Sequence, residues 1–192
     1  GKSDIQHART LLSLYSQNPC SYLALEDDKY LYFGSGRDGV IPYGTVGETV
    51  IVNGDPVCAD EDFPALLEEF KEFCQKSAHK LFFLSVTDHF LEEYRKQGFG
   101  CVKCGEEARF RLSEYELSGK KGAKMRMNLN HAAKAGVTVQ EYRVLEQRDP
   151  VIEQEFERIT QEWLQEKKSS LLKFTLGSVG IDAPMEDRKR VV

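Results

Sequence analysis

The sequence contains no long hydrophobic run. None of its apolar stretches approaches the roughly 18–20 residues that a membrane-spanning helix needs, and no signal-peptide pattern opens the chain. Hydrophobic residues nevertheless make up 41% of the 192 residues, with 11 Phe and 8 Tyr. This composition is typical of a folded domain and not of a disordered segment. We therefore expect a soluble globular protein with a sizeable core.

The sequence also lacks several motifs that identify an enzyme class. It has no Walker loop, no HExxH and no GxSxG. Its five cysteines are Cys20, Cys58, Cys74, Cys101 and Cys104. Their odd number and irregular spacing favour reduced thiols in a cytosolic setting. Cys101 and Cys104 form one CxxC, but no second CxxC or HxxxH completes a zinc site. We predict no metal, no cofactor and, from local motifs, no catalytic residue.

One segment lacks acidic residues altogether. Ser118–Ala135 contains no Asp or Glu, although the whole chain has 31 acids, 26 bases and a formal net charge of −5. The bases of this segment are Lys120, Lys121, Lys124, Arg126 and Lys134. At about 100° per residue, a helix places Met125, Leu129 and Ala132 on one stripe and most of the lysines opposite it. We predict a helix with one docked face and one cationic face.

An anionic partner explains this segment, because no acid at i±4 balances the lysines. An RNA backbone, a phospholipid head group or a nucleotide phosphate could each supply the counter-charge. The alternative is a solvated surface helix without any ligand.

Periodicity elsewhere predicts a mixed α/β unit with repeated strand-helix-strand passages. We expect strands at Tyr22–Leu25, Tyr30–Phe33, Glu48–Val52, Lys80–Val86, Cys101–Leu112 and Val137–Tyr142. The first two are expected to pair as a hairpin turned at Asp27 and Asp28, and Lys80–Val86 is expected to be buried. We expect helices at His7–Tyr15, Asp62–Cys74 and Asp88–Gln97, over the basic segment, and from Asp149 onward. The last helix is expected to bury Ile152, Phe156, Ile159 and Trp163.

The run Arg95–Gly100 matches the R/Q-x-x-G-x-G/A pattern of acetyl-CoA-dependent N-acetyltransferases. Such a loop works by directing free backbone N–H groups at phosphate. Here the glycines follow a helix and precede a strand, so we predict that Gly98 ends the helix. A CoA-dependent N-acyltransferase stays an alternative function.

Several blocks of the sequence together resemble one family. These blocks, in order, are Ala8–Leu12, Ser21–Leu25, Asp28–Phe33, Gly54–Val57, Gly105–Ala108, Gly119–Gly136, Trp163-Leu164 and Phe174–Gly177. They resemble the start of the cytosolic domain of bacterial phosphatidylglycerol lysyltransferases, the multiple peptide resistance factors. The resemblance covers nearly the whole chain. Gly1 in place of a Met, and an end at Arg190–Val192 that is typical of a strand just beginning, predict a piece excised from a longer protein.

The resemblance implies two tandem acetyltransferase-like (GNAT) folds joined by a basic helix, without bound acyl-CoA. The first fold would comprise residues 1–117, the linker helix 118–136, and an incomplete second fold 137–192. Members of the family move lysine, or sometimes alanine, from aminoacyl-tRNA to phosphatidylglycerol. This lowers the negative charge of the membrane surface and gives resistance to cationic antimicrobial peptides. The family's catalytic motif would lie beyond Val192, so the piece itself is expected to be inactive.

The resemblance also suggests where substrates bind. Phosphates of tRNA are expected at Lys120, Lys121, Lys124, Arg126 and Lys134, while possible lining of the substrate site is Glu106, Glu107, Asn128 and Asn130. Carboxylates are natural partners for a cationic aminoacyl group. The expected partners are aminoacyl-tRNA and phosphatidylglycerol at the cytosolic face of the bacterial membrane. Self-association is expected if the incomplete second fold leaves its helix uncovered. A non-catalytic module that binds anionic lipid is a further alternative.

Overall fold

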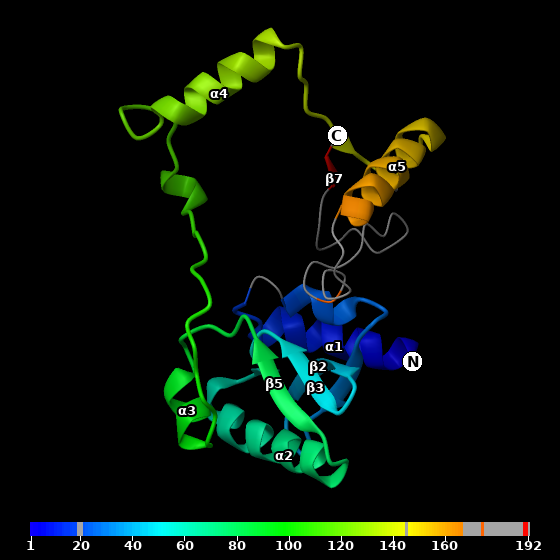
Figure 1. The fold of residues 1–192 in the computed structure, drawn as a ribbon, viewed down its shortest axis with the longest axis vertical. Coiled ribbons are helices and arrows are strands. Elements are labelled where there is room, and N and C mark those ends of the chain that lie inside the picture. Colours follow the sequence, from blue (N-terminus) through cyan, green and yellow to red (C-terminus); the bar gives the residue numbers. More distant parts are fainter. Residues whose placement is uncertain (19–20, 145, 167–173, 175–189, 192) are drawn as a thin grey trace. The chain divides into compact units, whose positions relative to one another are not determined.

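The computed structural model describes residues 1–18, 21–144, 146–166, 174 and 190–191 (Figure 1). The chain divides into two compact units. The first comprises the described residues of 1–104 and 163–179, and the second those of 105–162 and 180–192. Each unit is described below by itself. The predicted domain boundaries at 117/118 and 136/137 stay a prediction.

The first unit contains a five-stranded mixed sheet with the order β1-β2-β3-β5, in which β4 also pairs with β2. The strands are β1 (Tyr30–Phe33), β2 (Gly39–Val46), β3 (Thr49–Asn53), β4 (Val57–Cys58) and β5 (Lys80–Leu84). The pairs β1/β2, β2/β3 and β2/β4 are antiparallel, whereas β3 and β5 are parallel. The parallel pair brings the carboxyl ends of β3 and β5 to the same edge of the sheet.

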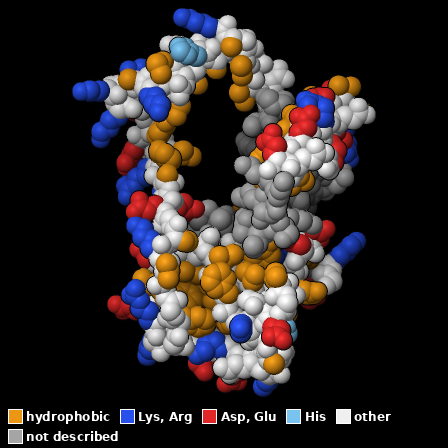
Figure 2. All heavy atoms as spheres, viewed as in Figure 1, with side chains coloured by type: hydrophobic (Ala, Val, Ile, Leu, Met, Phe, Trp, Pro, Cys, Tyr) orange, Lys and Arg blue, Asp and Glu red, His pale blue; other side chains and the backbone are white. Residues whose placement is uncertain are grey.

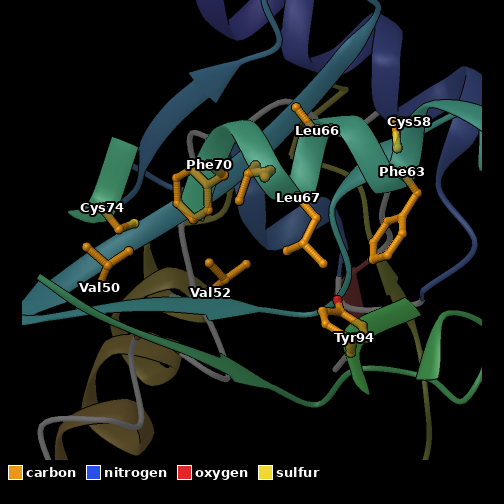
Figure 3. Packing of buried hydrophobic residues seen from close by; sticks show 10 residues of the cluster. Val50, Val52, Cys58, Phe63, Leu66, Leu67, Phe70, Cys74 and Tyr94 are labelled. Atoms are coloured by element: carbon orange, nitrogen blue, oxygen red, sulfur yellow. The ribbon is translucent and has the colours of Figure 1, made fainter. Parts of the chain in front are cut away.

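Helix α2 covers one face of this sheet. The helices of the unit are α1 (Lys2–Tyr15), α2 (Phe63–Lys76) and α3 (Leu91–Lys96), with 3-10 turns at Ser21–Leu25 and Asp60–Asp62. In α2 the fully buried residues are Phe63, Leu66, Leu67, Phe70 and Cys74, which recur at i, i+3, i+4, i+7 and i+11. Figure 3 shows Phe63, Leu67 and Phe70 on the side of α2 that faces Val50 and Val52 of β3. The predicted helix is confirmed, although the Asp62 side chain makes no capping hydrogen bond.

The opposite face of the sheet packs against α1. Ala8, Leu11 and Leu12 form a second cluster with Val40 of β2 and Val57 of β4. Val40 and its neighbour Ile41 belong to different clusters because successive strand residues point to opposite faces. The sheet therefore lies between two apolar layers, as an α/β fold requires.

Two predictions about strands in the first half of the chain are wrong. Ser21–Leu25 is a 3-10 helix, and β1 pairs instead with β2, which the sequence analysis missed. A short apolar run cannot be assigned to strand or helix by periodicity alone. Pro42 made β2 difficult to predict from the sequence. It lies where β2 changes its pairing partner, since Val40 pairs with β4 and Tyr43 pairs with β3. A proline is tolerated there because no N–H is needed for the ladder.

The predicted strand Cys101–Leu112 is also wrong. Residues 101–111 have no regular secondary structure, and a 3-10 turn follows at Leu112–Glu114. Strand β5 is present as predicted, but it is not fully buried, because the side chain of Phe82 is 52% exposed. Among the described residues, no strand pairs with the outer edge of β5. A strand forms only where another strand exchanges backbone hydrogen bonds with it. The strand-like sequence around Phe110 was therefore not enough to form a strand.

The second unit contains mostly helices. Its elements are α4 (Ala123–Lys134), β6 (Glu141–Tyr142), β7 (Arg190–Val191) and α5 (Pro150–Glu166) except for the last four residues of α5, which belong to the first unit. Strands β6 and β7 pair antiparallel, which confirms the strand expected at the end of the sequence. Helix α5 begins as predicted, since Asp149 Oδ1 accepts a hydrogen bond from the N–H of Val151 at 2.9 Å. The Tyr142 hydroxyl donates to Glu153 Oε1 at 2.6 Å and ties β6 to α5.

The prediction that α5 buries its apolar stripe is wrong. No residue of α5 is buried, and the side chains of Ile159 and Trp163 are 53% and 40% exposed. Phe156 contacts the ring of Tyr142, at 5.6 Å between centroids. A helix buries its stripe only where another layer covers it, and the described residues supply little cover. None of the described helices is long and apolar enough to cross a membrane.

Candidate nucleic-acid interface

The cationic surface consists of helix α4 and the turn before it. Gly119 enters this turn with φ +67°, and α4 begins after Gly122. Lys120 and Lys121 lie in the turn, and Lys124, Arg126 and Lys134 lie on the helix. All five side chains are exposed. Figure 2 shows blue basic side chains along α4 with no red acidic side chain on the helix. The structure thus brings together the basic residues that the sequence singled out.

The lysines of this surface have no acidic partner within the described part of the chain. Ion pairs form elsewhere, for example on α5, where Arg158 lies 2.8 Å from Glu155 and 2.6 Å from Glu162. Hydrogen bonds to these two carboxylates raise the pKa of Arg158. Helix α4 offers no acid at comparable spacing, so its charge is not neutralised locally.

The position of the lysines opposes the stability of α4. Lys120, Lys121 and Lys124 lie at the N-terminal end of the helix, where the macrodipole favours negative charge. The first turn contains no acidic residue, and no side chain caps it. Cations at this end cost about 0.3–1 kcal/mol each at an exposed site. A bound anion would offset this cost.

Arg126 differs from the lysines. Its Nη1 donates hydrogen bonds to the carbonyl oxygens of Leu117 and Gly119, the latter at 2.9 Å. Part of this guanidinium is therefore already engaged by the chain itself.

Helix α4 has no docked face, contrary to the prediction. None of its residues is buried, and Met125 and Leu129 are 46% and 51% exposed. The amphipathic pattern is present, but the described residues place no apolar layer over it.

The residues predicted to line the substrate site are not part of the lining of the pocket described below. Glu106 and Glu107 lie in the irregular segment 101–111, where Glu107 forms an exposed ion pair with Arg109 at 3.2 Å. Asn128 and Asn130 are exposed on α4. Their role in substrate binding stays a prediction.

A polar site lies at the carboxyl ends of β3 and β5 and was not predicted from the sequence. Asp55, which is nearly buried, accepts hydrogen bonds from the Tyr94 hydroxyl at 2.9 Å, the Thr87 N–H at 3.0 Å and the Thr87 hydroxyl at 2.8 Å. Burial and the neighbouring Asp55 charge raise the pKa of Tyr94. The carboxylate thus joins the ends of both strands to α3. The sequence Gly54-Asp55-Pro56 is typical of a turn, but only the parallel pairing of β3 with β5 reveals the polar site.

A small pocket of about 20 Å³, with room for little more than one water molecule, lies beside Asp55. Its lining includes Asn18, Cys58, Asp60, Thr87 and His89. His89 Nε2 lies 2.9 Å from Asp60 Oδ2. Burial raises the pKa of the Cys58 thiol to about 12, so this cysteine stays protonated and is not a nucleophile.

The structure offers no phosphate loop for CoA at Arg95–Gly100. The N–H of Gly98 donates to Arg95 and that of Phe99 to Tyr94, each at 3.0 Å, and Gly98 has φ +91°. This Schellman motif confirms Gly98 at the end of the helix and occupies the N–H groups that would bind phosphate. Asp55 and Asp60 make the neighbouring pocket unfavourable for a pyrophosphate.

Comparison with known protein families identifies the family of this chain. The family model described as "Phosphatidylglycerol lysyltransferase, C-terminal" matches residues 9–190. The chain belongs to this family. It is 29% identical to phosphatidylglycerol lysyltransferases of Staphylococcus xylosus, over 180 residues, and of Bacillus subtilis, over 179 residues. Each alignment covers 92% of this chain but only 21% and 20% of the relative.

Two solved structures share the fold of this family member. The C-terminal domain (DUF2156) of a putative lysylphosphatidylglycerol synthetase from Agrobacterium fabrum matches with a TM-score of 0.78 and 28% identity, covering 94% of this chain and 56% of that one. The L-PGS of Bacillus licheniformis matches with a TM-score of 0.70 and 26% identity, covering 85% and 50%. The predicted GNAT-like mixed sheet flanked by helices is confirmed. The chain spans about a fifth of the curated relatives.

Proposed function

We propose that this chain is the first part of the transferase region of a phosphatidylglycerol lysyltransferase, and that α4 with its preceding turn binds aminoacyl-tRNA. The observation that carries the proposal is the acid-free cationic surface in a member of this family. The parent enzyme would move lysine, or alanine, to phosphatidylglycerol at the cytosolic face of the membrane. This would reduce the surface charge that attracts cationic antimicrobial peptides.

The proposed reaction requires little covalent chemistry from the protein. The aminoacyl ester is already activated, so the lipid hydroxyl attacks the ester carbonyl, loses its proton and displaces the tRNA hydroxyl. An enzyme must orient the two substrates and stabilise the tetrahedral oxyanion. The His89–Asp60 pair lines the pocket in the first unit, whereas the basic surface proposed to hold the aminoacyl-tRNA lies on α4 of the second unit. We therefore assign tRNA binding to this chain and catalysis to the rest of the parent enzyme.

The test is the binding of tRNA-Lys to this chain over a salt series. Log affinity should fall linearly with log salt, and Lys120→Gln, Lys121→Gln and Lys124→Gln combined should reduce the slope by about 2–3, since each phosphate contact contributes about 0.7–0.9. The matched control replaces the exposed Lys76, Lys80 and Lys96 of the first unit by Gln and should retain the wild-type slope. Equal slopes for both triple variants would place the RNA elsewhere and overturn the proposal.

Anionic lipid is the second candidate partner of α4. The observation in its favour is the exposure of Met125, Met127 and Leu129 beside the lysines, because interfacial helices combine apolar and basic side chains. Binding to phosphatidylglycerol vesicles that tRNA does not compete away, with no binding of tRNA itself, would favour this function.

We also propose that α5 mediates self-association of this chain. Ile159 and Trp163 expose apolar surface that a second copy could cover. Sedimentation equilibrium should show a concentration-dependent dimer, and Ile159→Glu should weaken dimerisation at least tenfold by introducing an unpaired charge, about 1.4 kcal/mol or more. Glu157→Lys, an exposed change on the same helix, serves as the control. A wild-type chain that stays monomeric at high micromolar concentration would contradict the proposal.

A further inference from the structure

The turn before α4 is tightly folded. Gly119 has the left-handed φ of +67°, and Gly122 is buried against Leu117. A Cβ at Gly122 would lie 2.1 Å from the Leu117 carbonyl oxygen, so no other residue fits without opening the turn. Lys120 and Lys121 lie in this turn with exposed side chains.

Arg126 reaches back from the helix across this turn. The two hydrogen bonds of its Nη1 end on the carbonyl oxygens of Leu117 and Gly119, nine and seven residues earlier in the chain. These carbonyls lie at the start of the turn, whereas Gly122 lies at its end. Charge-assisted bonds to two carbonyls hold a backbone more firmly than neutral ones.

We propose that Arg126 is a positioning residue that clamps the turn Leu117–Gly122 and thereby presents Lys120 and Lys121 to the phosphates of tRNA. This inference rests on the proposed function. It assigns Arg126 a different role from the direct phosphate contact predicted from the sequence. The physical reason is preorganisation: side chains on a fixed turn lose less conformational freedom when they bind.

A double-mutant cycle separates the two roles of Arg126. Arg126→Lys keeps the charge but cannot form the same planar pair of bonds. We expect it to lower the affinity for tRNA-Lys about 5- to 30-fold, as two lysines lose their preordered turn. In a chain that already carries Lys120→Gln and Lys121→Gln, the same change should have no further effect, because nothing remains to be positioned. An equal loss in both backgrounds, or no loss in either, would overturn the proposal.

A second variant opens the turn without touching Arg126. Gly122→Ala retains every charge and should lower the affinity as much as Arg126→Lys does. The matched control is Lys96→Arg, at an exposed lysine of the first unit, which keeps the charge and should bind like the wild type. Wild-type affinity in Gly122→Ala would contradict the requirement for a closed turn.

Hydrogen exchange in the absence of RNA tests the clamp directly. The amide of Ala123, which donates to the Lys120 carbonyl at 3.3 Å, should exchange faster in Arg126→Lys and Gly122→Ala. Its exchange should be unchanged in Lys96→Arg. Unchanged exchange in both turn variants would overturn the clamp. A wild-type chain that binds no tRNA at low salt would overturn the proposed function together with this inference. If the wild type binds tRNA and Arg126→Lys binds it with the same affinity, only this inference is overturned.

Discussion

Replacing Asp55 by Ala is expected to lower the free energy of unfolding of the first unit by about 3–5 kcal/mol, because three buried or partly buried donors lose their acceptor. The carboxylate joins the end of β3 to the segment after β5 and to α3. Its loss should therefore loosen the whole carboxyl edge of the parallel pair. Urea unfolding followed by circular dichroism measures the effect.

Two further variants divide the contribution of Asp55, and a third serves as a control. Tyr94→Phe and Thr87→Val each remove one hydroxyl donor, and each should cost about 1–2 kcal/mol. The control is Asp38→Ala, at an exposed acid, which should change stability by less than about 0.5 kcal/mol. If Asp55→Ala is no more destabilising than Asp38→Ala, the network does not hold the strand ends together.

Replacing Phe70 by Ala is expected to cost about 3–5 kcal/mol, the usual range for a large buried aromatic side chain. Phe70 is fully buried in α2, and its ring lies 5.1 Å from that of Tyr32 and 5.6 Å from that of Tyr43. Its removal leaves a cavity between α2 and the sheet and breaks these ring contacts. Amide hydrogen exchange at Val50 and Val52 reports the loss in this unit.

The matched control for Phe70 is a phenylalanine on the same sheet. Phe82 of β5 is 52% exposed, so Phe82→Ala removes less buried area and should cost about 1 kcal/mol or less. Phe70→Leu fills most of the space and should be intermediate. Equal costs at Phe70 and Phe82 would show that the packing between α2 and the sheet does not dominate the stability of the unit.

The contrast between α2 and the segment 101–112 explains which elements the sequence could predict. In α2, apolar spacing, a proline in the first turn and length all indicate the same helix, and the helix forms its own backbone hydrogen bonds. A strand depends on a distant partner for those bonds. The pattern around Phe110 was therefore not enough to form a strand. By contrast, β2 forms despite Gly39, Pro42 and Gly44, because it pairs with other strands on both of its sides.

The candidate site shows the same division. The acid-free run of lysines is a property of local sequence, and the structure places it on one helix and its adjoining turn. The role of Arg126 was not visible, because a basic residue in a basic segment looks the same whether it faces solvent or its own backbone. Asp55 was not recognised as a junction, since its donors Thr87 and Tyr94 lie 32 and 39 residues away.

The sequence by itself determined the membership of the family, the helix α2, the charge of the α4 surface and the start of α5, because each depends on residues close together in the chain. Tertiary structure decided the pairing of β1 with β2, the network at Asp55, the clamp by Arg126 and the exposure of α4 and α5. These features depend on which hydrogen-bonding groups and apolar faces meet in the folded chain, at separations from 7 residues for Arg126 to 39 residues for Asp55. Local patterns carry no record of that partner.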